Sequence, residues 1–133
     1  MVKSESMEMY LETIYELENS HGHAHGVDIA NRLGVSKPSV TKAINVLKSK
    51  GLVNQETYGS VTLTEKGRKV SEEIYKKHMM ITQFLEHSLG LSYEEAAKNA
   101  CRIEHILSEE MFRAIKNYLK KVNLDNSDND KNE

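Results

Sequence analysis

The alternation of apolar and polar residues along the chain predicts mainly helices, interrupted by one pair of short strands. Apolar residues recur every three or four positions over residues 5–19, 27–33 and 36–50, the spacing that gathers them on one helical face. Residues 52–57 and 60–63 are strand-like and are separated by Tyr58-Gly59, which is typical of a β-hairpin. Helical spacing returns over residues 64–88 and 93–107, and again after Ser108. We expect Ser92 and Ser108 to cap the last two helices, and an apolar edge on the final helix at Met111, Ile115 and Leu119. The pattern therefore predicts a mainly α fold with one small hairpin.

The two helices before the hairpin have the features of a helix-turn-helix. A small residue, Ala30, and a glycine four positions later allow two helices to approach closely through a tight turn. Ser36 is a good N-cap for the second helix, Pro38 is tolerated in its first turn, and Gly51 fits its C-terminal end. We interpret the second helix as a recognition helix for a DNA major groove and the hairpin as a wing. An ordinary solvated helix face is the less favoured alternative.

The outward face of this second helix supplies the candidate DNA contacts. Residues 36–51 contain four lysines and no acid, so this stretch carries local positive charge. Hydroxyl, amide and ammonium groups project opposite the apolar stripe, where they can reach base edges or phosphates. The candidates are Ser36, Lys37, Pro38, Ser39, Thr41, Lys42 and Asn45, together with Tyr58 in the wing.

Composition favours an ordinary globular protein of one or two small lobes. The 133 residues are 38% hydrophobic and 29% charged, and no apolar run reaches the length of a membrane span. One cysteine and no signal peptide indicate a cytoplasmic protein. The net charge is −2, but residues 125–133 alone carry four acids and one lysine, which leaves +1 for residues 1–124. We expect a DNA-binding domain over residues 1–72, a helical domain over 73–122, and a disordered acidic tail over 123–133.

Three alternating histidines, His21, His23 and His25, lie between the first two predicted helices. Such tracts can bind metal. Because glycines punctuate this segment and no carboxylate or cysteine accompanies it, we expect a solvated loop.

Cys101, Glu104 and His105 form the strongest candidate site. In a helix, positions i, i+3 and i+4 share one face, so a thiolate, a carboxylate and an imidazole would lie together. These donors suit a first-row transition metal. A buried cysteine beside a surface Glu-His pair is an alternative that the spacing alone leaves open. A cysteine nucleophile with a histidine base is another, but no oxyanion hole or glycine-rich approach accompanies it, so we expect no enzyme.

Several segments together resemble the diphtheria-toxin-repressor family, whose members are metal-dependent transcriptional repressors. The likeness covers about residues 4–120 and is carried by residues 6–15, the Val35-Ser36-Lys37-Pro38-Ser39-Val40-Thr41 turn, Leu63-Thr64-Glu65-Lys66-Gly67, and residues 100–108. The Cys-Arg-x-Glu-His segment is the most specific of these. The resemblance implies an N-terminal winged helix-turn-helix and a C-terminal helical domain for dimerisation and metal binding, in a two-domain form without the SH3-like third domain.

The resemblance also implies a ligand set drawn from both domains. The family's primary metal site corresponds to Met9, Cys101 (through its side chain or its backbone carbonyl), Glu104 and His105, and a neighbouring site of the manganese regulators corresponds to Glu12 and His78. The manganese regulators have carboxylates where this chain has Met9 and Cys101, whereas the ancillary site of the iron regulators would fall on Thr82 and Ala97. Because thioether and thiolate ligands are soft, we expect Fe(II), with Mn(II) as the alternative, at one or two ions per subunit.

The expected function is that of a homodimeric repressor of iron or manganese uptake genes. Metal joining the two domains would activate binding to double-stranded operator DNA, without a membrane partner or a small-molecule substrate. The alternative is a winged-helix regulator that senses an organic ligand, in which the Cys-Glu-His face is structural.

Overall fold

The computed structural model describes residues 5–56 and 59–122, which fall into two compact units that divide between Ile74 and Tyr75. Tyr58 and the acidic tail predicted over residues 123–133 lie outside the described residues. Among the described residues, no helix is long and apolar enough to cross a membrane. The elements are α1 (Glu5–His21), β1 (Ala24–His25), α2 (Gly26–Leu33), α3 (Lys37–Ser49), β2 (Val53–Gln55), β3 (Ser60–Leu63), α4 (Glu65–Leu89), α5 (Tyr93–Ile103) and α6 (Glu109–Lys121).

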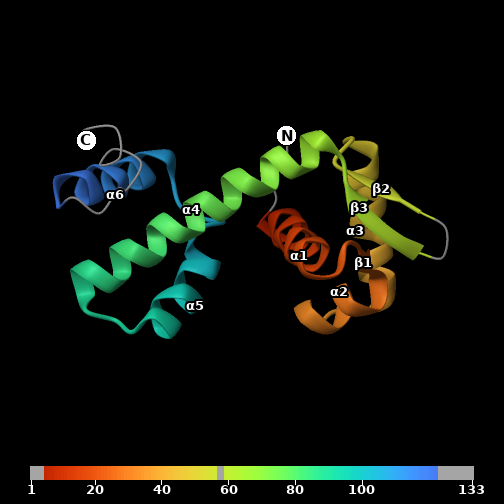
Figure 1. The fold of residues 1–133 in the computed structure, drawn as a ribbon, viewed down its shortest axis with the longest axis horizontal. Coiled ribbons are helices and arrows are strands. Elements are labelled where there is room, and N and C mark those ends of the chain that lie inside the picture. Colours follow the sequence, from red (N-terminus) through yellow and green to blue (C-terminus); the bar gives the residue numbers. More distant parts are fainter. Residues whose placement is uncertain (1–4, 57–58, 123–133) are drawn as a thin grey trace. The chain divides into compact units, whose positions relative to one another are not determined.

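The first unit is a winged helix-turn-helix, as predicted, in which α1, α2 and α3 pack beside a small antiparallel sheet (Figure 1). Gly34 has φ +68° between α2 and α3, a left-handed conformation that glycine adopts without a Cβ clash. Ser36 caps α3 by accepting a hydrogen bond from the Ser39 N–H at 3.2 Å. The core contains Leu11, Ile14, Ile29, Leu47, Leu52 and Val61, all fully buried.

The sheet has three strands, one more than the hairpin that the sequence predicts. Its order is β1-β3-β2, with Val53 opposite Leu63 in the wing and Ala24 opposite Val61 at the other edge. The prediction of a solvated loop over the histidine segment is therefore wrong for Ala24 and His25. A two-residue strand has too short an apolar pattern to be recognised in a sequence, and it forms because β3 offers it a paired edge.

The wing and the start of α4 are joined by a close backbone contact. Thr64 Oγ1 accepts a hydrogen bond from the Gly67 N–H at 3.0 Å and donates one to the Gly51 carbonyl at 2.7 Å. A Cβ atom at Gly67 would overlap the Leu52 carbonyl group, so only glycine fits there. This junction fixes the first turn of α4 against the segment that follows α3.

In the second unit, α5, α6 and the C-terminal part of α4 pack around their own core. That core is made of Ile81, Leu85, Ala96, Ala100, Ile115 and Leu119. Ser92 and Ser108 cap α5 and α6 as predicted, accepting from the Glu95 and Met111 N–H groups. The predicted apolar edge of α6 is buried at two of its three positions, because Met111 is exposed.

Candidate metal centre and DNA-binding face

Glu104 is the centre of a cluster of potential metal ligands in the second unit. Its side chain is 1% exposed, and its Oε1 atom lies 2.8 Å from His78 Nδ1 while its Oε2 atom lies 3.1 Å from His105 Nε2. The His105 side chain is also buried. Burial of a carboxylate is costly unless positive charge or hydrogen-bond donors surround it. The His78 ring supplies a hydrogen bond to this carboxylate, and either imidazole adds positive charge when it is protonated.

Cys101 belongs to the same cluster. Its Sγ atom lies within 4.8 Å of a Glu104 carboxylate oxygen, and the residue is half-buried in the last turn of α5. The structure thus brings together four of the predicted ligands, His78, Cys101, Glu104 and His105. One thiol, one carboxylate and two imidazoles are donors that a borderline divalent transition metal accepts, so the residues present fit such an ion.

The local backbone differs from the prediction at this site. We expected one helix from residue 93 to about 107, but α5 ends at Ile103. Glu104 keeps helical dihedral angles (φ −58°, ψ −27°), and its N–H donates to the Ala100 carbonyl at 2.9 Å. The Ile106 N–H then donates to the Ile103 carbonyl at 3.0 Å, a tighter turn. Cys101 and Glu104 therefore keep helical spacing, whereas His105 lies in the turn that leads to α6.

α4 holds His78 through two neighbours that the sequence analysis did not single out for this role. The Thr82 hydroxyl donates to the His78 carbonyl at 2.8 Å, and the Tyr75 ring stacks on the imidazole with centroids 6.3 Å apart. Both lie at helical spacing from His78, at i+4 and i−3, which is the only signal that could have indicated them. Thr82 is buried, and its hydroxyl group is engaged within its own helix.

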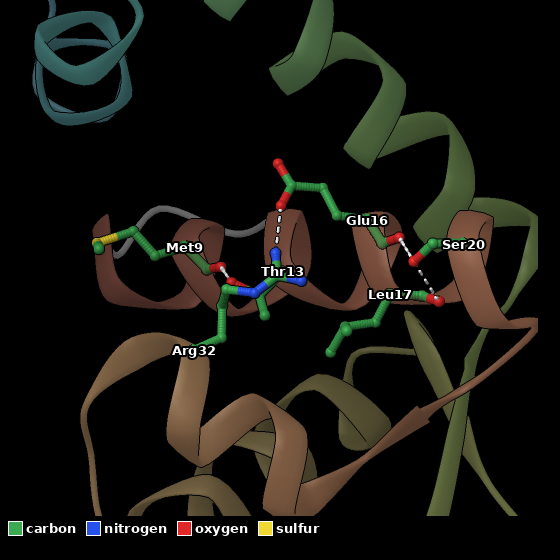
Figure 2. Close-up of polar contacts among 6 residues, drawn as sticks. All are labelled: Met9, Thr13, Glu16, Leu17, Ser20 and Arg32. Atoms are coloured by element: carbon green, nitrogen blue, oxygen red, sulfur yellow. Dashed lines mark hydrogen bonds and ion pairs between the residues drawn. The ribbon is translucent and has the colours of Figure 1, made fainter. Parts of the chain in front are cut away.

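Met9 and Glu12, the two predicted ligands of α1, belong to the first unit. Glu12 is buried, whereas Met9 is 38% exposed. Figure 2 shows the Met9 side chain pointing away from the ion pair that joins Glu16 of α1 to Arg32 of α2 at 2.8 Å. The Met9 carbonyl accepts a hydrogen bond from the Thr13 hydroxyl at 2.9 Å, so its sulfur is the group left to act as a ligand.

Met9 also lines a largely apolar groove of about 410 Å³ within the first unit. The groove runs between α1 and α3, and its α3 side includes Ser39 and Lys42. A candidate metal ligand and two candidate DNA contacts therefore border the same space.

The predicted DNA-binding face of α3 is exposed along its length. Val40, Ala43, Ile44 and Leu47 are buried beneath it. The Ser36 hydroxyl is occupied, because it accepts from the Ser39 N–H and donates to the Ser39 hydroxyl at 2.9 Å. Ser39 thus retains its own hydroxyl proton for another acceptor. The exposed candidates are Ser36, Lys37, Pro38, Ser39, Thr41, Lys42 and Asn45.

The fold and the cluster define a winged-helix DNA-binding protein with a metal-binding helical unit. Residues 3–61 match the family described as iron dependent repressor, N-terminal DNA binding domain. Residues 64–131 match iron dependent repressor, metal binding and dimerisation domain. The chain belongs to the iron-dependent repressor family, and the resemblance to the diphtheria toxin repressor is confirmed. It is a metal-dependent transcriptional regulator and not an enzyme.

The similar proteins include the iron-dependent repressor IdeR of Mycobacterium tuberculosis and a solved structure of the manganese regulator SloR, which has a TM-score of 0.71 at 28% identity and covers 90% of this chain and 55% of that one. An uncharacterised HTH-type transcriptional regulator of Methanocaldococcus jannaschii is 36% identical over 89% of this chain and 95% of its own length. The transcriptional regulator MntR of Escherichia coli is 36% identical over 90% of this chain and 76% of its own. The crystal structure of T. acidophilum IdeR superposes with a TM-score of 0.78 at 29% identity, covering 89% of this chain and 54% of that one. The chain spans about half the length, 48%, of the mycobacterial iron-dependent repressors that it also matches.

Proposed function

We propose that the chain is a homodimeric repressor of metal-ion uptake genes that binds its operator when Fe(II) is bound, with Mn(II) as the alternative ion. The observation that carries this proposal is the buried Glu104 carboxylate between His78 and His105, with the Cys101 thiol close by. Similarity to an iron-dependent repressor and to the manganese regulator SloR supports a divalent first-row ion.

The proposed ligands are Met9, Glu12, His78, Cys101, Glu104 and His105. The last four are supported by their proximity in the second unit, and the first two by the family resemblance. Six donors suffice for one six-coordinate ion or for two ions that share carboxylates, so the expected stoichiometry is one or two ions per subunit.

The preference for iron follows from the softness of two donors. Met9 offers a neutral thioether and Cys101 a thiol, whereas Mn(II) favours carboxylate, carbonyl and water oxygens. Soft donors therefore favour Fe(II) over Mn(II) at this ligand set.

The proposed regulation depends on ligands that belong to different units. A bound ion supplies positive charge that Glu12 and Glu104 neutralise together. Met9 and Glu12 lie on α1 of the DNA-binding unit. When they bind the ion, they favour the arrangements of the chain in which all six donors reach it. Metal concentration is then coupled to DNA binding by a population shift toward this arrangement. In the dimer, this arrangement places the recognition helices of the two subunits near a multiple of ~34 Å apart, as successive major grooves require.

The test is an operator-binding titration against Fe(II), Mn(II), Zn(II) and Co(II) under anaerobic, reducing conditions. The DNA is a fragment that metal-loaded protein selects from a random-sequence library. We expect a chelator to abolish tight binding while the protein stays folded and dimeric, and Fe(II) to restore it at a lower concentration than Mn(II).

A matched pair of variants distinguishes the loss of a metal ligand from the loss of an ordinary carboxylate in the same region. Glu104→Gln removes the buried charge and should raise the activating concentration of every metal by about 10–100-fold or more. Glu95→Gln changes an exposed carboxylate on α5 and should leave activation unchanged. Equal operator binding with chelator and with each metal would refute the proposal and favour a sensor of organic ligands.

A further inference from the structure

His23 and His25 form a second cluster of metal-ligating groups, within the DNA-binding unit. Their Nε2 atoms lie 3.0 Å apart, and the two rings make an edge-to-face contact with centroids 4.6 Å apart. This pair shares no residue with the ligand set proposed above.

The pairing follows from the strand that the sequence analysis did not predict. Ala24 is fully buried and pairs with Val61, and His25 pairs with Ser60. Since successive side chains of a strand point to opposite sides, His23 and His25 both project from the side opposite Ala24. His25 stands at the N-cap of α2, where its side chain makes no capping hydrogen bond, so its imidazole is not committed to the helix end.

The distance between the nitrogens suits chelation of a single ion. Two nitrogens about 2.0–2.1 Å from a first-row metal lie roughly 2.9–3.4 Å apart when the angle at the metal is about 90–109°. The observed 3.0 Å, at which one ring donates a hydrogen bond to the other, falls within this range. Both imidazoles can therefore bind one ion when that proton is lost and the rings turn, without a change of backbone. His23 is half-buried and His25 is exposed, which leaves room for water to complete the coordination.

We propose that His23 and His25 bind one divalent transition ion of the borderline class, such as Ni(II), Zn(II) or Cu(II), beside the wing. Imidazole donors suit these ions, whereas Mn(II) and Mg(II) favour oxygen ligands. The pairing of β1 with β3 fixes the backbone at His25 and next to His23, which reduces the ordering cost of binding. The DNA-binding unit thus carries a metal site separate from the Glu104 cluster.

Equilibrium dialysis of the full chain against Ni(II), with bound metal measured by mass spectrometry, tests this proposal. We expect His23→Gln and His25→Gln each to lower the Ni(II) affinity of one site per subunit by at least about tenfold. Mutation of a residue that only hydrogen-bonds a metal ligand already costs about 10–100-fold in affinity, and loss of the ligand itself should cost no less. Glutamine keeps a polar side chain of similar size, and circular dichroism confirms that each variant is folded. Mn(II) should not occupy this site at comparable concentrations.

Two controls distinguish the pair from its surroundings. His21→Gln, at the end of α1 in the same tract, should leave Ni(II) binding unchanged. The Glu104→Gln variant should still bind Ni(II) at His23 and His25. This result would show that the His23–His25 site does not depend on the metal site of the proposed function. Unchanged Ni(II) binding in a folded His23→Gln variant, or an equal loss in His21→Gln, would overturn the assignment.

Discussion

Two side chains, Met9 and Glu104, show how differently single residues contribute to the proposed site. Glu104 is buried, hydrogen-bonded to the His78 ring and 3.1 Å from a ring nitrogen of His105. Met9 is 38% exposed and borders the groove beside α3. A rigid buried carboxylate is suited to fixing the position of an ion, and an exposed thioether is suited to tuning which ion is preferred.

Replacing Met9 with aspartate is expected to change metal preference. Met9→Asp adds a hard anionic oxygen, so Mn(II) should activate operator binding at a roughly tenfold lower concentration, equivalent to ~1.4 kcal/mol. Cys101→Glu should act in the same direction, and the two effects should not be additive because both donors face one ion. The measurement is the half-activating concentration of Fe(II) and of Mn(II) for each variant.

The groove makes the choice of readout important for this variant. A carboxylate at position 9 borders the same space as Lys42 and could draw its ammonium group away from DNA. The ratio of the Fe(II) and Mn(II) concentrations cancels such an effect, whereas absolute affinity does not. Met9→Leu keeps the packing and removes the sulfur, so it should weaken Fe(II) activation. An unchanged ratio in Met9→Asp would show that Met9 is a packing residue.

At the scale of elements, α3 has one buried apolar face and one exposed polar face. Val40, Ile44 and Leu47 are buried, and Ser39, Lys42 and Asn45 are exposed. The periodicity of the sequence was sufficient to predict this division, because burial of an amphipathic helix follows its apolar stripe.

Lys42→Ala should weaken operator binding by about 1–3 kcal/mol, because it removes a cation from the middle of this exposed face. The slope of affinity against salt concentration should fall by about one released counterion. Lys69→Ala removes an exposed lysine of α4 and serves as the control. Metal affinity should be the same in both variants, and unaltered operator binding in Lys42→Ala would mean that the face of α3 is misassigned.

The junction between the wing and α4 should be sensitive to a single methyl group. Gly67→Ala places a Cβ atom against the Leu52 carbonyl group and should destabilise the protein by about 1–3 kcal/mol or more. Gly26→Ala is the matched control, because its Cβ would meet only Val40 Cγ1 at 3.9 Å. Chemical denaturation measures both free energies of unfolding, and equal values would show that the junction can relax.

Sequence patterns predicted the helices and the hairpin strands β2 and β3, and missed the two-residue strand β1. Caps at Ser36, Ser92 and Ser108 followed from residue type, because each hydroxyl satisfies an N–H group of the first turn. No glycine or proline marks the end of α5, so spacing alone extended that helix through His105. β1 depends on pairing with β3, a contact between distant residues. The proximity of His78 to Glu104, 26 residues apart, likewise came from resemblance and not from local pattern.

At the scale of the whole molecule, two cores divide the chain, and large exposed apolar residues mark the second unit. Leu89 is 65% exposed and Ile106 is 64% exposed. The second unit matches a dimerisation domain, and apolar surface of this kind is commonly covered by a second subunit.

The double variant Leu89→Asp/Ile106→Asp should shift the protein from dimer to monomer. Two buried charges would oppose association, whereas both positions are exposed in the single chain, so folding should be unaffected. Sedimentation with chelator present measures the oligomeric state apart from any effect on the metal site. Val27→Asp, at an exposed position of the first unit, should remain dimeric. A double variant that stays dimeric would place the interface on another surface.

Cys101 is the one cysteine of the 133 residues, and it lies within 4.8 Å of the Glu104 carboxylate. A thiol-specific alkylating reagent therefore marks each chain once, at the proposed metal site and nowhere else. If Cys101 is a ligand, metal-loaded chains resist labelling, and intact-mass spectra show labelled and protected chains as separate peaks. The fraction protected then counts occupied sites in a sample whose DNA binding is measured in parallel. If operator binding reaches its maximum when only half of the chains are protected from alkylation, dimers with metal in one subunit are able to bind DNA.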